Sequence, residues 1–167
     1  MFRKGALVRY GQSGVCCIEE IQEMSMGTEK QEYYVLRPLF KTGTVYVPCL
    51  NLELSRRMLP LLTAEEIDGA LKKARETEAF WIRDFRSRSE FCKKALASGD
   101  RADALILIKN YYHHRNQTVG EGKRLHTSDD YFLRDAEQLV FHEFSYVLGK
   151  DYEEVAREVR EQIGAES

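Results

Sequence analysis

The chain has 167 residues, a length that suits one ordinary domain or two small ones. Lysine and arginine number 25 against 27 aspartate and glutamate, and no window approaches the ~18 consecutive apolar residues of a membrane-spanning helix. The N-terminal segment turns polar too soon for a secretory signal peptide. The sequence therefore predicts a cytoplasmic protein that does not enter a membrane.

The first third of the chain has the alternating pattern of β-strands. Short β-branched and aromatic runs are separated by glycine-containing segments, which predicts an antiparallel meander with three hairpin turns. Pro48 ends the last core strand, because proline cannot donate to a strand ladder. The predicted strands occupy residues 6–10, 14–18, 33–36 and 44–48.

From about residue 60 onward, apolar residues recur at helical spacing between caps and breakers. Thr63 and Glu66 have the spacing of a capping box, and Gly149 is a typical residue to follow a helix C-terminus. We expect the helices at about 64–74, 84–97, 101–115, 127–148 and 152–163. The fold class is therefore α+β: a Tudor/SH3-like small antiparallel β barrel over residues 1–58, then an all-α bundle of about five helices over residues 60–167.

The net charge of −2 conceals a local asymmetry. Between Arg83 and Arg124 there are ten basic residues and five acidic ones, whereas from Leu125 onward four basic residues face eleven acidic ones. A basic segment attracts nucleic acid even when the whole chain is slightly acidic. Duplex DNA is therefore a candidate partner.

Trp81 is the only tryptophan, and it lies in an aromatic and arginine-rich segment with Phe85. Such a cluster places guanidinium groups on phosphates while a ring inserts between or against bases. The same spacing also suits two core anchors one helical turn apart, with the arginines on a solvated face. The cluster comprises Trp81, Arg83, Phe85, Arg86 and Arg88, and Lys93 and Lys94 extend its charge.

No catalytic or metal site stands out. The four cysteines form no CxxC pair and fit small buried residues. His142 and Glu143 lack the second histidine of a zincin motif, and Glu143 lies on an apolar stripe where a carboxylate usually makes a structural hydrogen bond. A metal-dependent hydrolase using His113, His126 or His142 remains a rival interpretation. We expect a non-enzymatic protein with no cofactor and no small-molecule substrate.

Tyrosines are the informative residues of the β half. They could line an aromatic cage for a modified lysine, or they could fill the barrel while a free sheet edge accepts a strand from a partner. We favour strand addition, because a cage needs convergent side chains. The tyrosines concerned are Tyr10, Tyr33, Tyr34 and Tyr46.

Taken together, these segments resemble the CarD family (CdnL-like) of bacterial transcription regulators. The resemblance starts in the opening strand and turn and extends into the helical half. The segments that carry it are 5–15, 32–36, 45–48, Trp81-Ile82 with Arg88, 96–100, 123–129 and 136–139.

The resemblance implies a β domain that docks on the RNA polymerase β subunit by edge-strand pairing, and a helical domain that contacts promoter duplex DNA at the upstream edge of the transcription bubble. It implies a change in open-complex stability and no bond made or broken. The wedge residue of the family maps to Phe85, one turn after Trp81, so either ring is a candidate. Arg83, Arg86, Arg88, Lys93 and Lys94 would contact the DNA backbone, and Met24, Tyr34 and Tyr46 the polymerase.

Gly11 stands where the family usually has proline, and Met24 and Tyr46 stand where other members present arginine. The alternative is a protein–protein adaptor whose helical half binds a second protein and does not touch DNA.

Overall fold

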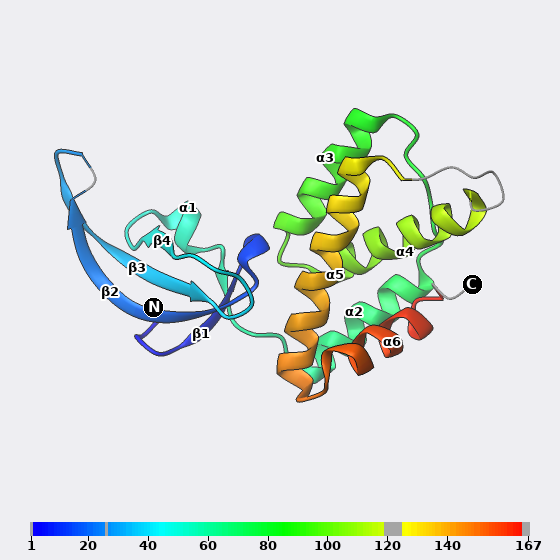
Figure 1. Cartoon of the computed structure of the whole chain (residues 1–167). Coiled ribbons are helices and arrows are strands. Elements are labelled where there is room, and N and C mark those ends of the chain that lie inside the picture. Colours follow the sequence, from blue (N-terminus) through cyan, green and yellow to red (C-terminus); the bar gives the residue numbers. More distant parts are fainter. Residues whose placement is uncertain (1, 26, 119–124, 165–167) are drawn as a thin grey trace. The chain divides into compact units, whose positions relative to one another are not determined.

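The computed structural model describes residues 2–25, 27–118 and 125–164 (Figure 1). The chain forms two compact units, Met1–Leu61 and Leu62–Ser167. None of the helices within the described ranges is long and apolar enough to cross a bilayer.

The first unit is a five-stranded antiparallel sheet with the strand order β4-β3-β2-β1-β5. The hairpin between β1 and β2 turns through a short 3₁₀ segment, Gly11–Ser13, in which Gly11 has a φ of 48°. A left-handed backbone of this kind costs glycine little, which explains the residue in this tight turn. The strands are β1 Leu7–Tyr10, β2 Val15–Ser25, β3 Lys30–Pro38, β4 Val45–Pro48 and β5 Met58–Leu59.

One face of the sheet carries the core of this unit. Alternate residues of the strands point to the same face, so the core draws on every strand. A bulge between Ile18 and Glu20 shifts the register of β2 on β3, beyond which both strands continue as a long hairpin (Figure 1). The buried cluster consists of Val8, Cys16, Ile18, Tyr34, Leu36, Val47 and Met58.

The predicted α+β class and antiparallel strands are confirmed. Within the described residues, no ladder joins β4 to β5, so the sheet keeps two edges. The short helix α1 (Leu52–Ser55) was not predicted from the sequence; the Asn51 side chain caps its start by accepting a hydrogen bond from the Leu54 amide at 3.1 Å. Four residues are too few for a periodic pattern, so only the Asn51 cap signals this helix.

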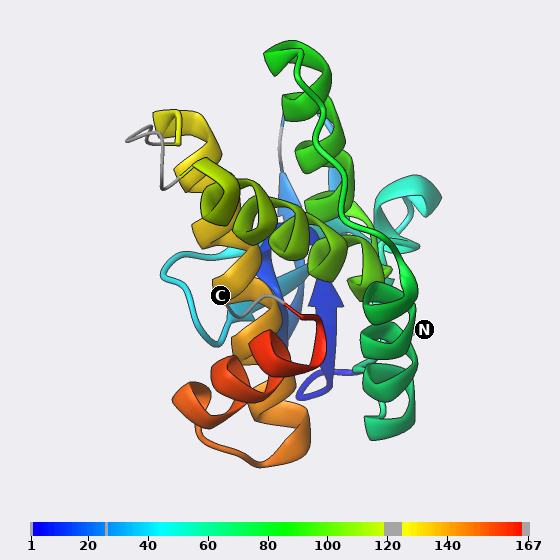
Figure 2. The ribbon, with the colours of Figure 1, turned by 90° about the vertical axis from the view of Figure 1, so that its right-hand side faces the viewer.

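The second unit consists of helices α2 to α6, in agreement with the predicted bundle. Thr63 and Glu66 form the predicted capping box at the start of α2, and Gly149 ends α5 in the left-handed conformation. Figure 2 shows α6 folding back along the end of α5. The helices are α2 Ala64–Glu76, α3 Phe85–Ala97, α4 Arg101–Thr118, α5 Thr127–Leu148 and α6 Tyr152–Gln162.

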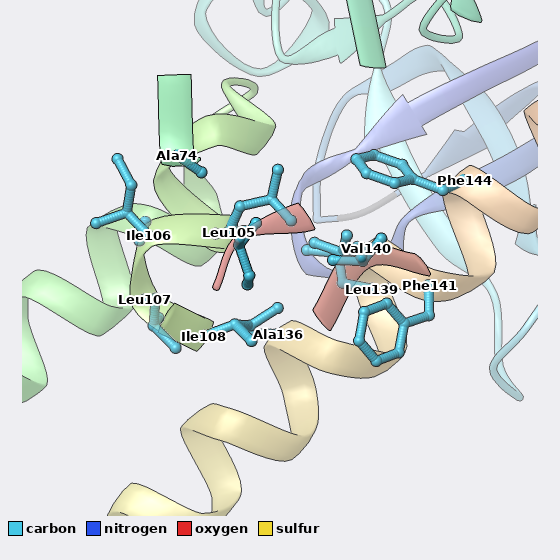
Figure 3. Close-up of a cluster of buried hydrophobic side chains, with 14 of the residues drawn as sticks. Ala74, Leu105, Ile106, Leu107, Ile108, Ala136, Leu139, Val140, Phe141 and Phe144 are labelled. Carbon is cyan, nitrogen blue, oxygen red and sulfur yellow. The ribbon is translucent and has the colours of Figure 1, made fainter. Parts of the chain in front are cut away.

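Helix α4 is the centre of this unit and packs against α2, α3 and α5. It is buried on nearly all sides along its first three turns, as expected for a helix without a polar face. Figure 3 shows Leu105 and Ile108 of α4 near Ala136, Val140 and Phe144 of α5 in the core.

One ion pair lies inside this core. The Arg101 guanidinium donates to Glu143 Oε2 from Nε at 3.1 Å, and its Nη2 lies 3.0 Å from the same oxygen. Both side chains are buried, and Arg101 also donates to the Ser98 carbonyl. The predicted structural hydrogen bond of Glu143 is thereby confirmed, and it fixes the α3–α4 turn on α5.

Candidate functional site

Trp81 lies in the segment before α3, where its indole is packed between side chains from α3 and α4. It stacks on the His114 ring with centroids 3.6 Å apart and an interplanar angle of 1°. It also meets the edge of Tyr111 at 5.4 Å, and the Arg88 guanidinium carbon lies 4.7 Å from its centroid. The indole is half-buried, so it is both a core anchor and part of the surface.

Arg88 is the residue around which this cluster is organised. Its Nε and Nη2 donate to the two carboxylate oxygens of Asp129, each at 2.8 Å, and its Nη1 donates to the carbonyls of Ile82 and Arg83. The side chains of Arg88 and Asp129 are only 12% and 3% exposed. Arg88 therefore ties α3 and the segment before it to the first turn of α5.

Tyr111 completes the buried network from α4. Its hydroxyl donates to Asp129 Oδ1 at 2.6 Å and lies 3.3 Å from Cys92 Sγ. Burial raises the pKa of Tyr111, and its hydrogen bond to Asp129 raises it further. Burial alone would raise the pKa of Asp129, but the hydrogen bonds from Arg88 and Tyr111 outweigh it and hold that pKa below its usual value. Asp129 is therefore an anion throughout the neutral range.

Phe85 begins α3 and is 41% exposed. The Asp84 side chain caps the helix by accepting hydrogen bonds from the Ser87 amide and hydroxyl at 2.9 and 2.7 Å, which fixes the first turn. The Phe85 ring lies 4.9 Å from the His126 ring and 5.3 Å from the Arg88 guanidinium carbon. Phe85 is therefore a ring on a rigid helix start that still presents much of its surface to solvent.

Basic side chains surround Phe85 and continue along the outer face of α3. Within the described residues, no carboxylate forms an ion pair with Arg83, and Arg86 reaches Glu90 only at 3.9 Å with its own side chain 90% exposed. Lys93 follows Arg86 by seven residues and so lies on the same helix face, about 10 Å further along. The exposed cations are Arg83, Arg86, Lys93 and Lys94.

The predicted DNA-binding set thus divides into two parts. Trp81 and Arg88 belong to the packed network, whereas Phe85 and the four exposed cations form a surface, which we call the α3 face (Arg83, Phe85, Arg86, Lys93 and Lys94). His114, Tyr111 and Asp129 also belong to this cluster, and the sequence did not predict them as its partners. Asp129 stands in a Thr-Ser-Asp-Asp run at the start of α5, a pattern typical of helix caps, so the sequence gives no sign of its pairing with Arg88.

The hollow beside Trp81 holds about 10 Å³, which is roughly room for one water molecule. Its lining is mostly apolar and includes Phe80, Phe91 and Leu107. In the described parts of the chain, no group of three histidine, cysteine or acidic residues is placed to hold a metal ion. The α3 face is thus an exposed surface beside a hollow too small for a metabolite.

In the first unit, the outer edge of β4 offers backbone groups to a partner. The Cys49 amide donates to the Glu32 carbonyl at 3.0 Å, so in this antiparallel register the next hydrogen-bonded pair is Tyr34 with Val47. Tyr46 lies opposite Val35, between this pair and the following one, Leu36 with Val45, and its N–H and C=O therefore point away from β3. The Tyr46 side chain is exposed as well.

The other two residues predicted to bind polymerase differ from Tyr46. Tyr34 is 5% exposed and belongs to the core cluster, so its side chain is not part of any surface. Met24 is half-buried near the tip of the β2–β3 hairpin, where it pairs with Gln31. Only Tyr46 combines an exposed side chain with a free strand edge.

A small antiparallel sheet with a free edge strand such as β4 is typical of a protein-docking module. Residues 2–59 match the family model of the CarD-like/TRCF RID domain. The first unit is therefore a CarD-like RNA polymerase-interacting domain, and the chain is an RNA polymerase-interacting transcription factor. This domain family is non-catalytic. The match concerns the first unit, and no curated protein matches the chain in sequence.

Proposed function

We propose that the protein regulates transcription initiation by holding the RNA polymerase β subunit with its first unit and promoter duplex DNA with its second. The contact on DNA at the upstream edge of the bubble changes the stability of the open complex. Regulation of this kind needs no bond to be made or broken.

The polymerase contact uses the outer edge of β4. Strand addition draws its affinity from backbone hydrogen bonds and its selectivity from side chains at alternate positions. Tyr46 supplies an N–H and a C=O to the partner strand, and its exposed ring lies next to that strand. Pro48 has no N–H, so it limits the length of strand that pairs here.

The DNA contact uses the α3 face. The observation that carries this proposal is the exposed Phe85 ring flanked by the exposed cations Arg83 and Arg86 at the start of a capped helix. Guanidinium groups bind phosphates, and an apolar ring inserted in the minor groove unstacks a base step and bends the duplex. A residue doing this at the bubble edge favours an opened over a closed duplex.

Phe85 suits the role of wedge better than Trp81. Trp81 would have to leave its stack on His114 and its contact with Arg88 to reach a base. Phe85 makes only a tilted contact with His126 and a 5.3 Å contact with Arg88. We therefore assign insertion to Phe85 and support of the helix start to Trp81.

Charge reversal of Arg83 and Arg86 together tests the proposal. Each phosphate contact contributes about −0.9 to the slope of log affinity against log salt concentration, so R83E/R86E should flatten the slope for the polymerase–promoter complex by about 2. Affinity for polymerase without DNA should stay unchanged. The matched control is K72E/R157E, which makes the same change in net charge at two exposed positions away from α3.

An equal loss of both affinities in R83E/R86E would contradict this division of labour. A wild-type salt slope that the variant leaves unchanged would favour the protein–protein adaptor without DNA contact. The control variant separates these outcomes from a general effect of charge.

A further inference from the structure

The two most exposed of the large apolar side chains described lie together at the end of β4. Leu50 is 82% exposed and Leu52 is 62% exposed. Exposing this much apolar surface to water is unfavourable in free energy, and a partner that buries the leucines would remove that penalty. We call Leu50 and Leu52 the leucine pair.

The structure holds the leucine pair in a defined place. The Asn51 amide donates to the Pro48 carbonyl at 3.2 Å, and the Asn51 side chain caps α1. Leu54 packs against the core of the first unit. Since successive residues of a helix are 100° apart, Leu52 points away from that core. Leu52 is thus presented by a short anchored helix, and Leu50 by the turn that leads into it.

The leucine pair is continuous with the free edge of β4. Leu50 follows Tyr46 by four residues, a distance of at most about 14 Å even in a fully extended chain, and α1 packs beside β4. Glu53 of α1 pairs at 3.1 Å with Arg57, which lies two residues beyond the helix, and the C-cap residue Arg56 is exposed. The leucine pair is therefore the apolar part of the surface beside the edge, with exposed charged side chains next to it.

We propose that the leucine pair is an apolar anchor that buries itself against an aliphatic surface of the polymerase β subunit, next to the strand added to β4. This rests on the proposed docking at the β4 edge and adds its side-chain specificity. Backbone pairing alone accepts almost any extended strand, whereas the leucine pair selects one with an apolar neighbour.

The test measures the affinity of the full chain for purified RNA polymerase. L50S/L52S should weaken binding by about 10- to 100-fold, as expected for the loss of two partly buried leucines. L50M/L52M keeps the apolar surface and should bind within about threefold of wild type. The matched control is Y131S, which removes a tyrosine of similar exposure (58%) from the second unit. Thermal melts of all variants should agree, because these side chains are exposed.

A separate variant distinguishes failure of this inference from failure of the docking proposal. Y46P removes an N–H that faces away from β3, so the β3–β4 ladder keeps its bonds. Weak binding by Y46P with normal binding by L50S/L52S would overturn the anchor and leave edge docking in place. The converse would support the anchor and overturn strand addition. Normal binding by both variants would overturn both.

Sedimentation of the free chain tests whether a second copy of the chain, and not polymerase, binds the leucine pair. A wild-type dimer that L50S/L52S converts to monomer, together with unchanged polymerase affinity, would overturn the anchor and assign the leucine pair to self-association.

Discussion

Replacing Asp129 by asparagine removes the charge that holds Arg88 between α3 and α5 while keeping the size of the side chain. In the wild type, two hydrogen bonds of 2.8 Å join the Arg88 guanidinium to both carboxylate oxygens. An amide oxygen can accept only one of them, and the amide nitrogen of the new side chain would face a guanidinium N–H. D129N therefore leaves a nearly buried cation without its anion.

The loss of stability in D129N depends on the hydrogen bonds that Arg88 retains in the variant. Breaking a buried ion pair by removing one partner costs about 3–5 kcal/mol. Arg88 is 12% exposed and still donates to the carbonyls of Ile82 and Arg83 in the variant, and the asparagine oxygen can still accept from Tyr111. We therefore expect D129N to lower the free energy of unfolding by about 2–3 kcal/mol.

The effect also has a definite dependence on pH. The pKa of Asp129 is lower in the folded protein than in the unfolded chain. Its contribution is therefore complete above the unfolded pKa of about 4 and is lost as the pH falls through the lower folded value. The wild-type advantage over D129N should be constant near neutral pH and shrink below about pH 4.

Urea unfolding followed by tryptophan fluorescence measures both quantities, because Trp81 is the only tryptophan and contacts Arg88 directly. The matched control is D130N, the same chemical change at an exposed neighbour in the same helix turn, which should alter stability by less than about 0.5 kcal/mol. The reasoning is refuted if D129N costs under about 1 kcal/mol, or if its deficit is unchanged down to acidic pH.

Two further predictions separate structure from function. Because Phe85 is exposed, F85A should lower the free energy of unfolding by less than about 1 kcal/mol but shorten the lifetime of the open complex. Because Trp81 is packed, W81A should lower the free energy of unfolding by about 2–3 kcal/mol. Equal stability losses would contradict the assignment of the wedge to Phe85. G149A should cost about 1 kcal/mol in urea unfolding, because Gly149 has a φ of 64° and an added Cβ meets no atom within 4 Å, so only backbone strain is added. G69A, inside α2 with equally free space, should stabilise instead, and a loss at both positions would contradict this reasoning.

Local signals in the sequence were enough to predict most element boundaries. The capping box of Thr63 and Glu66 lies within three residues, and the left-handed end at Gly149 needs a single residue. The alternating runs of the first third predicted strands because their pattern, too, is local to a few consecutive residues. Signals of this kind survive in any tertiary context, because they satisfy backbone groups within one turn.

The organisation of the aromatic cluster was not predictable in this way. Arg88 and Asp129 are 41 residues apart, and Tyr111 is 18 residues from Asp129. By spacing and charge, Arg88 is one more cation in a basic segment like Arg86, and neither signal predicts its pairing with Asp129. Tyr34 shows the same limit in the β unit, because alternation says that it shares a face with Leu36 but not which face is covered.

The modest size of the α3 face fits a protein that reaches DNA only when polymerase has brought it there. Four exposed cations neutralise at most about four phosphates, which makes for weak and salt-sensitive binding by themselves. Tethering through the first unit converts the second contact into an intramolecular one, with an effective concentration in the millimolar range for a short connection. Weak intrinsic affinity is then an advantage under the proposed function, because the free protein, with its net charge of −2, stays off bulk DNA and acts where polymerase has already opened a promoter.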